Sequence, residues 1–383
     1  MPSCAYASRW MSEDVKAFRA TVRQFVRTEF VPAQECWREH HGPDAAAWST
    51  AGRAGILLPD VPGEYGGGGG TFAHEAVVLE ELAFAGVHFG SVIQSVVAQY
   101  ILAYGTEQQK LAWLPPMARG DLVGAIAISE PAAGSDVQGI QLTASRAGDC
   151  YLINGSKTFI TNGAQAGLVC LAVKTNPNVN GVKGISLIVV ETNGLAGYRV
   201  GRALEKVGMH GQDTRELFFD DVRVPVANLL GPAEGKGFSQ MMDRLVYERL
   251  GVAIGAVAVA ERAVAVTKRY VKERSAFGKP LIDFQNTRFK LAECQTAAHV
   301  GRVFVDSCIE RFLAGQLDDT TAAMAKYWLT DSQCRVVDEC LQLHGGYGYM
   351  TEYPIARMWT DSRVQRIYAG SNEIMKEVIA CAL

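Results

Sequence analysis

The sequence lacks the features that mark several classes of protein. Its nine cysteines are scattered along 383 residues without a C-x-x-C pair, which argues against a disulfide framework and a structural zinc site. The longest small or apolar run, Leu250 to Ala260, is shorter than the roughly 18 residues that cross a bilayer, and glycine interrupts it. The N-terminal segment has no uniform apolar core, so we expect an unprocessed chain without a membrane span. Unpaired cysteines predict a reducing compartment, most simply the cytoplasm.

The sequence also has no large excess of positive or negative charge. The formal net charge is −3 at pH 7, so no overall positive field exists to attract a nucleic-acid backbone. The hydrophobic fraction of 48% and the charged fraction of 20% are ordinary for a globular protein and exclude wholesale disorder. The length corresponds to two or three domains, or to one large one.

Hydrophobic periodicity divides the chain into three parts. Residues 1–120 carry apolar residues at helical spacing, with breaker segments that include Leu114-Pro115-Pro116, and predict an N-terminal helical domain whose first helix is capped near Ser12. Residues 121–232 contain short runs rich in β-branched and aromatic residues between Gly, Asn and Asp turns, and predict a middle β domain, a barrel or sandwich. Residues 233–383 return to helical spacing and predict a C-terminal helical domain, a four-helix bundle. The fold class is therefore α+β.

One carboxylate stands out in the third part. On a helical wheel Glu248 shares a face with Met241, Leu245, Gly251 and Gly255, so it lies on a stripe of apolar and very small residues. Desolvation there would raise its pKa toward the range useful to a general base. An i to i+4 ion pair with Arg244 is the simpler alternative, and the residues alone favour it.

Other motifs are less specific when taken singly. The glycine run from Gly66 to Gly70 lacks the Lys-Ser/Thr of a phosphate loop and is interpreted as a flexible turn. His344 has no other metal-ligating residue at suitable spacing, so we expect a structural role and no metal site. A later helix begins after Ser371, and helix N-termini receive anionic groups readily.

Taken together, four signatures in order resemble the acyl-CoA dehydrogenase family, and the similarity covers essentially the whole chain. They are ISEPAAGSD at residues 128–136, INGSKTFITNG at 153–163, ERSAFGKP at 273–280, and QLHGGYGYMTEYPIAR at 342–357 with IYAGSNEI at 367–374. The resemblance implies an N-terminal helical domain, a middle β domain and a C-terminal four-helix domain. It also implies bound FAD and a homotetramer arranged as a dimer of dimers.

The resemblance assigns the FAD contacts to three groups. The flavin ring is expected against Ile126, Ile128, Ser129, Gly134, Ser135, Phe159, Ile160 and Thr161. The ADP half is expected, across a dimer interface, against Arg274, Phe277, Gln285, Gln342, Gly345 and Gly346. Ser371 and Glu373 are expected to serve the cofactor of their own subunit.

The family's reaction, oxidation of a saturated acyl-CoA thioester to the trans-2-enoyl-CoA, needs a base for the α-proton. Most members place that base where this chain has Ala369, which cannot transfer a proton. Members of the long-chain and isovaleryl types carry it in an E-R-L sequence on the long C-terminal helix, and this chain has Glu248-Arg249-Leu250 there. The resemblance therefore implies that Glu248 is the catalytic base, and the closest branch is the long-chain one. The expected substrate contacts are Ser135, Tyr247, Arg249, Ala369 and Gly370.

The resemblance also implies an electron-transfer flavoprotein as the acceptor of the electrons. Two alternatives stay open at this point. The acyl group could be carried by a carrier protein in a biosynthetic pathway, or the chain could be a flavin-binding scaffold that has lost catalysis, as Ala369 suggests.

Overall fold

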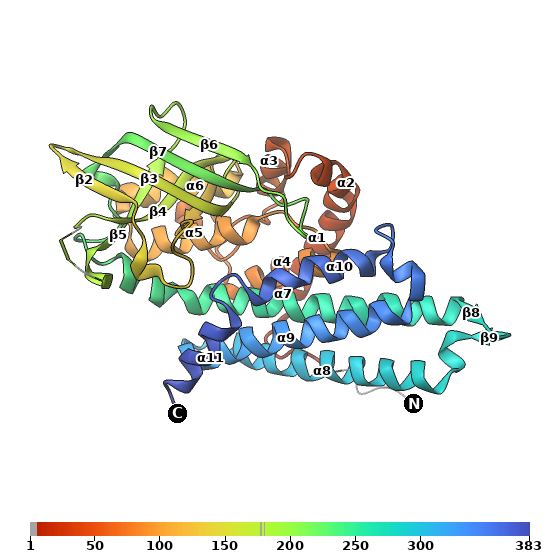
Figure 1. Ribbon diagram of the computed structural model, residues 1–383. Coiled ribbons are helices and arrows are strands. Elements are labelled where there is room, and N and C mark those ends of the chain that lie inside the picture. The colour runs from red at the N-terminus through yellow and green to blue at the C-terminus, as the bar shows by residue number, and fades with distance from the viewer. Residues whose placement is uncertain (1–5, 177, 180) are drawn as a thin grey trace.

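The computed structural model describes residues 6–176, 178–179 and 181–383, and Figure 1 shows their arrangement. Along the chain, helices come before and after the strands of the sheet, so the predicted order of helix, β and helix is confirmed. The boundaries 1–120, 121–232 and 233–383 stay predictions. The sheet occupies one end of the molecule in Figure 1, and the long helices of the C-terminal part run beneath it to the opposite end.

The N-terminal part, described from residue 6 onward, contains six α-helices. They are α1 (Glu13–Phe25), α2 (Val31–Glu39), α3 (Ala45–Arg53), α4 (Phe72–Ala85), α5 (Ser91–Tyr104) and α6 (Glu107–Arg119), with a π-helical turn η1 (Val26–Phe30) between the first two. Thr71 and Thr106 begin α4 and α6 with capping boxes, completed by His74 and Gln109. Ser12 is the N-cap residue of α1, as predicted, but its side chain does not accept a backbone N–H.

The prediction of a break at Pro115-Pro116 is wrong. Both prolines lie inside α6, which continues to Arg119, and the break comes earlier, at Gly105. Proline in a helix removes the N–H that would bond four residues back. Here the carbonyls affected belong to Leu111 and Ala112, which are exposed and can bind water instead.

The middle part is one mixed seven-stranded sheet. Its strands are β1 (Val123–Ala127), β2 (Thr143–Ala147), β3 (Cys150–Thr161), β4 (Ala166–Lys174), β5 (Ile185–Glu191), β6 (Tyr198–Ala203) and β7 (Thr214–Pro225). The order is β1-β4-β2-β3-β7-β6, and β5 pairs antiparallel with β4. β1 pairs parallel with β4. This pairing places β1 next to α5.

Strand β4 is buried on both faces, and its sequence explains why. Because successive side chains of a strand point to opposite faces, Leu168, Cys170 and Ala172 pack into the helical core while Val169 and Leu171 fill the interior of the β domain. The apolar run LVCLAV supplies both sets. The helical and β parts of the molecule are therefore joined through a hydrophobic strand.

The C-terminal part consists of α7 (Gly237–Glu273), α8 (Gln285–Leu313), α9 (Asp319–Leu343), α10 (Pro354–Ser362) and α11 (Asn372–Ala380). A two-stranded hairpin, β8 (Ser275–Ala276) and β9 (Lys279–Pro280), projects beyond the end of α7. α7 is long and apolar enough to cross a membrane by length and composition, but 61% of its most apolar window is buried inside the protein. Burial of this kind is typical of the core helix of a globular protein.

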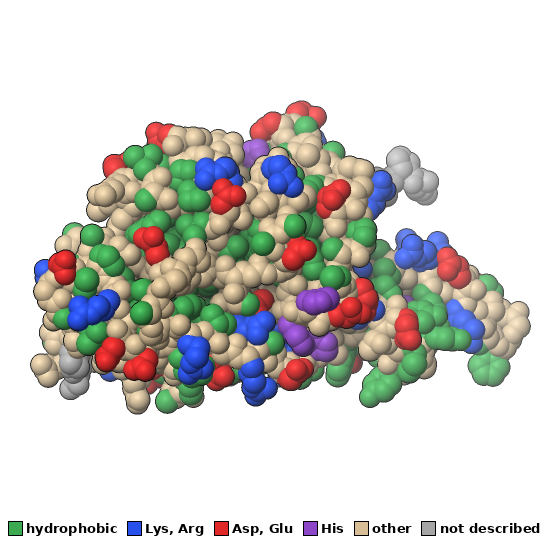
Figure 2. Space-filling model, turned by 90° about the horizontal axis from the view of Figure 1, so that it is seen from above, with side chains coloured by type: hydrophobic (Ala, Val, Ile, Leu, Met, Phe, Trp, Pro, Cys, Tyr) green, Lys and Arg blue, Asp and Glu red, His purple; other side chains and the backbone are tan. Residues whose placement is uncertain are grey.

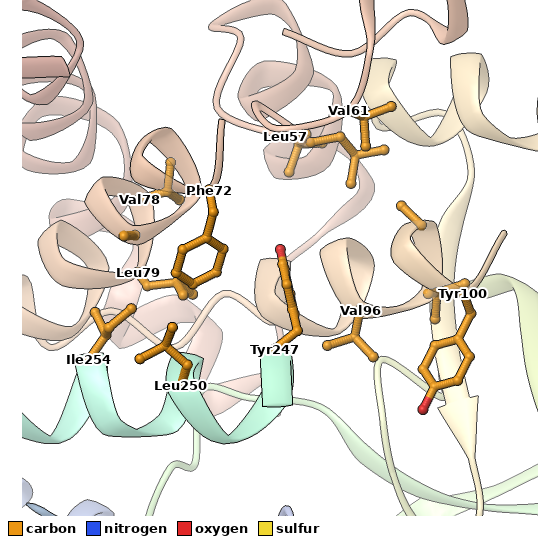
Figure 3. Packing of buried hydrophobic residues seen from close by; sticks show 14 of the residues in the cluster. Leu57, Val61, Phe72, Val78, Leu79, Val96, Tyr100, Tyr247, Leu250 and Ile254 are labelled. Atoms are coloured by element: carbon orange, nitrogen blue, oxygen red, sulfur yellow. The ribbon is translucent and has the colours of Figure 1, made fainter. Parts of the chain in front are cut away.

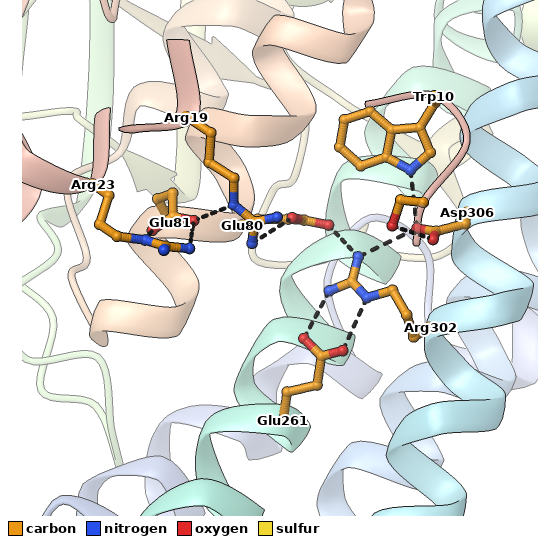
Figure 4. Close-up of polar contacts among 9 residues, drawn as sticks. Trp10, Arg19, Arg23, Glu80, Glu81, Glu261, Arg302 and Asp306 are labelled. Atoms are coloured by element: carbon orange, nitrogen blue, oxygen red, sulfur yellow. Dashed lines mark hydrogen bonds and ion pairs between the residues drawn. The ribbon is translucent and has the colours of Figure 1, made fainter. Parts of the chain in front are cut away.

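A network of buried charges links four helices across the N- and C-terminal parts (Figure 4). Arg302 on α8 forms ion pairs with Glu80 of α4, with Glu261 of α7 at 2.8 Å, and with Asp306. Glu80 and Glu81 also pair with Arg19 of α1. Buried charges are tolerated when each is paired, so this network fixes how the helices meet.

The described residues contain no cluster of His, Cys, Asp or Glu that could hold a metal ion, and their eight cysteines are free. On the face shown in Figure 2, acidic and basic side chains are interspersed rather than gathered into a patch of one sign.

Candidate active site

A cavity of about 790 Å³ lies where the three parts of the molecule meet. β1, β3 and the loop after β1 form one wall, α7 forms the second, and α4, α5 and the turn between them form the third. The segment that joins α10 to α11 also lines the cavity, together with residues of α2, α9, α10, α11 and the loop before β7. The cavity follows α7 from Phe238 to Arg262, and apolar side chains of α4 and α5 face that helix along the way.

Glu248 on α7 lines this cavity and is half-buried. Its Oε1 atom accepts a hydrogen bond of 3.1 Å from the hydroxyl of Tyr100 on α5. Burial raises the pKa of Glu248 to about 7, although the hydrogen bond from Tyr100 and the charge of Arg249 both lower it. The alternative ion pair with Arg244 does not form, because Arg244 pairs with Asp243 at 2.6 Å. Glu248 therefore has the environment of a carboxylate that exchanges a proton near neutral pH.

The turn Ala369-Gly370 lies on the cavity wall, and both residues have positive φ angles, 52° and 84°. A buried cation holds it in place: Lys326 on α9 donates hydrogen bonds to the carbonyl of Gly370 at 2.7 Å and to Asn372 Oδ1 at 2.9 Å. Burial lowers the pKa of Lys326 to about 8. Ser371 caps α11 by accepting the N–H of Ile374, as the sequence predicts.

Arg249 lines the same cavity and is almost entirely buried. Its Nη1 atom is 3.3 Å from Asp319 Oδ1, whereas its Nε atom is buried without a hydrogen-bond partner among the described residues. Burial lowers the pKa of Arg249. A cation, Arg249, therefore follows Glu248 on the cavity wall, and its Nε–H group can donate a hydrogen bond to a ligand.

The β wall is built from two segments that a buried ion pair holds together. Lys157 on β3 is fully buried, and its Nζ atom donates to Glu130 Oε1 and to the carbonyl of Ile128, both at 2.8 Å. Glu130 accepts the backbone N–H groups of Gln141 and Leu142. The loop after β1 is thereby fixed against β3, and burial lowers the pKa of Lys157 to about 8.

The wall residues fit a flat, hydrogen-bonding ring of the kind that the sequence resemblance implies. Phe159 has a φ angle of 60° and leaves 70% of its side chain exposed, although it stands between buried residues of β3. A bulky residue adopts such a backbone conformation only where the surroundings require it. A Cβ atom added at Gly134 would meet nothing within 4 Å, so the loop leaves open space there. Two buried side-chain oxygens on the lining, Gln333 Oε1 and Gln365 Oε1, have no partner among the described residues and can accept hydrogen bonds from a bound group.

The structure brings most of the predicted site residues to this one cavity. Its lining includes Glu248, Arg249, Ile126, Ile128, Ser129, Gly134, Ser135, Phe159, Ile160, Thr161, Ala369 and Gly370. Ser371 and Glu373 lie directly beyond Gly370, at the start of α11.

Tyr247 is a predicted substrate contact that the structure does not bring to the cavity. Its hydroxyl donates to Asp60 Oδ2 at 3.2 Å, and its ring packs against Phe72 and Phe312. Figure 3 shows the Tyr247 side chain pointing toward Leu57 and Val61, whereas the hydroxyl of Tyr100 points the opposite way. Adjacent residues of a helix are about 100° apart, and here that rotation turns Tyr247 toward Asp60 while Glu248 lines the cavity.

The residues predicted for the ADP half gather elsewhere, at the far end of α7 and α9. Phe277 is 94% exposed at the tip of the β8–β9 hairpin, and Arg274 lies over the ring of Tyr347, 5.5 Å from its centroid. Gln285, Gln342, Gly345 and Gly346 are exposed nearby. Within one chain these residues do not line the cavity. His344 is buried, its Nδ1 atom is 2.8 Å from the Cys340 carbonyl, and its ring stacks on Tyr270, in agreement with a structural role.

Three residues of the site were missed from the sequence: Tyr100, Lys326 and Lys157. Tyr100 is 148 positions from Glu248 and lies in an ordinary apolar helix, so no local pattern marks it. The two lysines carried a signal, because each stands among apolar or small residues, in AMAKYW and INGSKTF. A lysine among apolar residues suggests a buried position, and a buried lysine almost always has a hydrogen-bonding or charged partner.

Three domain families match successive parts of the chain. The acyl-CoA dehydrogenase N-terminal domain matches residues 12–121, the middle domain residues 125–222, and the C-terminal domain residues 235–383.

The chain is similar to characterised proteins over nearly its whole length. It is 44% identical to the mitochondrial long-chain specific acyl-CoA dehydrogenase of Rattus norvegicus, over 97% of this chain and 87% of that protein. The crystal structure of acyl-CoA dehydrogenase from Geobacillus kaustophilus superposes with a TM-score of 0.95 at 46% identity, covering 98% of this chain and 99% of that one. A glutaryl-CoA dehydrogenase from Mycobacterium smegmatis in complex with FADH2 has a TM-score of 0.91 at 29% identity, covering 98% and 95%.

Proposed function

The chain belongs to the acyl-CoA dehydrogenase family of FAD-dependent oxidoreductases, and we propose that it oxidises long-chain acyl-CoA thioesters to trans-2-enoyl-CoA with Glu248 as the base. The observation that carries the proposal is the half-buried carboxylate on α7, which shares a cavity with the open aromatic wall of β3. Ala369 does not weaken the proposal, because Glu248 provides the proton acceptor that Ala369 cannot.

Glu248 takes the proton from the carbon next to the thioester carbonyl. With a pKa of about 7 the carboxylate is partly ionised at neutral pH and strong enough as a base to accept the proton. Charge then develops on the carbonyl oxygen of the substrate. We expect the N–H group of Ala369 to donate to that oxygen, because Ala369 lines the cavity in a turn that Lys326 fixes through the carbonyl of Gly370.

FAD, when bound, supplies at its N5 atom the acceptor for the hydride that leaves the β-carbon. Ile126 to Ser135 and Phe159 to Thr161 would hold its ring, because they form the wall of the cavity that lies across from α7. Ser371 and Glu373, at the start of α11, would serve its phosphates or ribityl chain through the helix N-terminus. Apolar lining on α4 and α5 excludes water from the acyl chain.

The shape of the cavity supports a long acyl chain. Its lining follows α7 for 14 residues beyond Glu248, to Arg262, which corresponds to roughly 21 Å at the rise of an α-helix. Gly251 and Gly255 leave space between α7 and α4 for the chain, and larger side chains there would reach toward Leu79 and Ala83, which lie 3.4 Å and 3.8 Å from added Cβ atoms. The name of the rat relative, long-chain specific, agrees with this shape. We further propose that an electron-transfer flavoprotein reoxidises the enzyme and that the enzyme is a homotetramer, as the family resemblance implies.

Anaerobic mixing of the FAD-loaded protein with acyl-CoA thioesters of graded length tests the proposal. We expect the yellow flavin to bleach most rapidly with long chains, and we expect Glu248→Gln to slow bleaching at least 1000-fold, since a residue that transfers the proton is removed. Glu205→Gln, at a position outside the cavity, is the matched control and should bleach at the wild-type rate. Bleaching of Glu248→Gln at the wild-type rate would refute the base, and no bleaching of the wild type with any thioester would refute the activity.

A further inference from the structure

Tyr100 is the one described side chain that forms a hydrogen bond with Glu248, and no motif of the chain assigns it a role. It lies near the end of α5 and is completely buried. Its hydroxyl is 3.1 Å from Glu248 Oε1. We propose that Tyr100 is the positioning residue of the catalytic base: it holds one carboxylate oxygen of Glu248 so that the other faces the substrate. This inference rests on the proposed function.

The direction of the hydrogen bond follows from the ionisation of the two groups. Burial, with the nearby charge of Glu248, raises the pKa of Tyr100 well above its ordinary value, so the phenol stays protonated and must donate. A carboxylate is a strong acceptor for such a donor. The ionised form of Glu248 is therefore stabilised, which agrees with the direction in which Tyr100 moves the pKa of Glu248.

The geometry also decides which oxygen is free. Glu248 Oε1 is held by Tyr100, whereas Oε2 forms no hydrogen bond with any described residue and is not sealed from the cavity that Glu248 lines. A carboxylate without such a contact can rotate about its side-chain bonds. It then spends part of its time in orientations that do not face the substrate, which lowers the rate of proton transfer. Tyr100 fixes the carboxylate by one oxygen and leaves the second for the reaction.

The other groups that face Glu248 do not replace this contact. Arg249 follows it on α7 but directs Nη1 to Asp319, 3.3 Å away. Cys170 on β4 is buried near Glu248, and burial raises the pKa of its thiol to about 12, so it stays neutral. Tyr104, one turn along α5 from Tyr100, donates to Asp243, which also binds Arg244. Tyr100 is the donor that both reaches Glu248 and remains neutral at physiological pH.

The experiment compares the FAD-loaded wild type with Tyr100→Phe and Tyr104→Phe. Phenylalanine keeps the ring in each case and removes one hydroxyl, and the two tyrosines lie on the same helix, so Tyr104→Phe is a matched control. The rate of flavin bleaching by a long-chain acyl-CoA at low concentration is measured from pH 5.5 to 9. Flavin content and the temperature of unfolding are recorded for every variant.

In the wild type we expect the rate to rise with pH through about 7, as Glu248 loses its proton. Tyr100→Phe should move this midpoint upward by about one pH unit, because a hydrogen bond to the ionised form is lost. At pH 6.5 this shift alone should make the variant roughly eightfold slower, and the difference should narrow at pH 9 as both carboxylates ionise. Tyr104→Phe should follow the wild-type profile.

An unchanged midpoint in Tyr100→Phe would overturn the inference, as would a loss of rate that is the same at every pH. Glu248→Gln separates this failure from failure of the proposed function. If Glu248→Gln abolishes bleaching while Tyr100→Phe leaves the midpoint in place, only the role of Tyr100 is wrong. If Glu248→Gln bleaches normally, the base itself is wrong.

Discussion

At the scale of single residues, two carboxylic acids outside the active site, Asp60 and Glu75, form no ion pair with any described residue. Asp60 Oδ1 and Glu75 Oε1 are buried and have no hydrogen-bond partner among the described residues. Asp60 Oδ2 accepts hydrogen bonds from Gln99 at 3.0 Å and from Tyr247. Burial raises the pKa of Asp60 to about 6, and burial together with the charge of Asp60 raises the pKa of Glu75. Burial makes the ionised form of each acid costly, so both acids hold their protons to a higher pH than they would in the unfolded chain.

This pair predicts that stability falls as pH rises. The folded state binds the proton of Asp60 more tightly than the unfolded state, so its contribution is complete below pH 4 and is lost as pH passes through about 6. The shift from 3.8 to about 6 corresponds to at most about 3 kcal/mol. Asp60→Asn should remove this loss, so that its free energy of unfolding, relative to wild type, increases between pH 4.5 and 7.5.

Urea unfolding of the FAD-loaded protein at several pH values measures this difference. Glu64→Gln, an exposed acid in the neighbouring turn, is the control and should keep a constant offset from the wild type. A constant offset for Asp60→Asn as well would show that Asp60 does not titrate on folding.

How much of the site the sequence predicted depends on the range of the interactions involved. The local pattern on α7 marks Glu248 as a carboxylate among apolar residues, but those residues alone favoured an ion pair with Arg244. Its role as base was implied by the family resemblance at Glu248-Arg249-Leu250 and stays a prediction. Tyr100 was not predicted, because its contact with Glu248 exists only after α5 and α7 pack together. Tyr247, which the resemblance placed among the substrate contacts, does not line the cavity, because the helix turns its side chain toward Asp60.

At the scale of elements, α7 determines how far an acyl chain can extend. Gly255 lies seven residues beyond Glu248, roughly 10 Å along the axis, and both line the cavity. Gly255→Leu should block the cavity there. We expect flavin bleaching by long-chain thioesters to slow at least tenfold, while short-chain thioesters keep their rate.

Gly255→Ala is the matched control for this prediction. It adds a single methyl group near Ala83 Cβ, 3.8 Å away, and replaces glycine by the best helix former, so the temperature of unfolding should rise while long chains are still accepted. Equal rates of Gly255→Leu with long and short chains would contradict the proposed path of the acyl chain.

Most elements themselves followed from periodicity, and the errors have physical causes. β4 and β5 were recognisable as continuous apolar runs, since strands buried on both faces need no polar alternation. The end of α6 was misjudged because two prolines signal a break in general, whereas here the carbonyls left unpaired face water. The links between helices, such as Arg302 with Glu80 and Glu261, join residues up to 222 positions apart and leave no local trace.

At the scale of the whole molecule, the two groups of predicted cofactor residues lie apart. The flavin wall belongs to the cavity, and Arg274, Phe277 and the turn after α9 lie at the far end of α7. If they serve the same FAD, they must come from different subunits, as the family resemblance implies. We therefore expect Arg274→Ala to lose FAD during gel filtration, whereas Arg202→Ala, which removes an exposed arginine of β6, retains it.

A mixed oligomer tests whether Arg274 acts on the neighbouring subunit. Co-expression of Arg274→Ala chains with Glu248→Gln chains gives dimers in which one site has Glu248 and also receives Arg274 from the other chain. Such mixtures should recover up to about half of the wild-type bleaching per mixed dimer, although each variant alone is impaired. No recovery would mean that Arg274 acts within its own chain and would contradict the cross-subunit arrangement.

Because α7 carries Glu248 in its first half and ends at Glu273, next to Arg274, one uninterrupted rod sets both the distance and the rotation between the two. Insertion of a single residue after Arg262, beyond the part of α7 that lines the cavity, would turn the hairpin by about 100° around the axis and advance it by about 1.5 Å. The insertion mutant would keep its own base and acyl channel yet present the hairpin in the wrong direction to its neighbour. If the hairpin binds the cofactor of a neighbouring subunit, as the family resemblance implies, the number of residues between Glu248 and Arg274 has to stay constant.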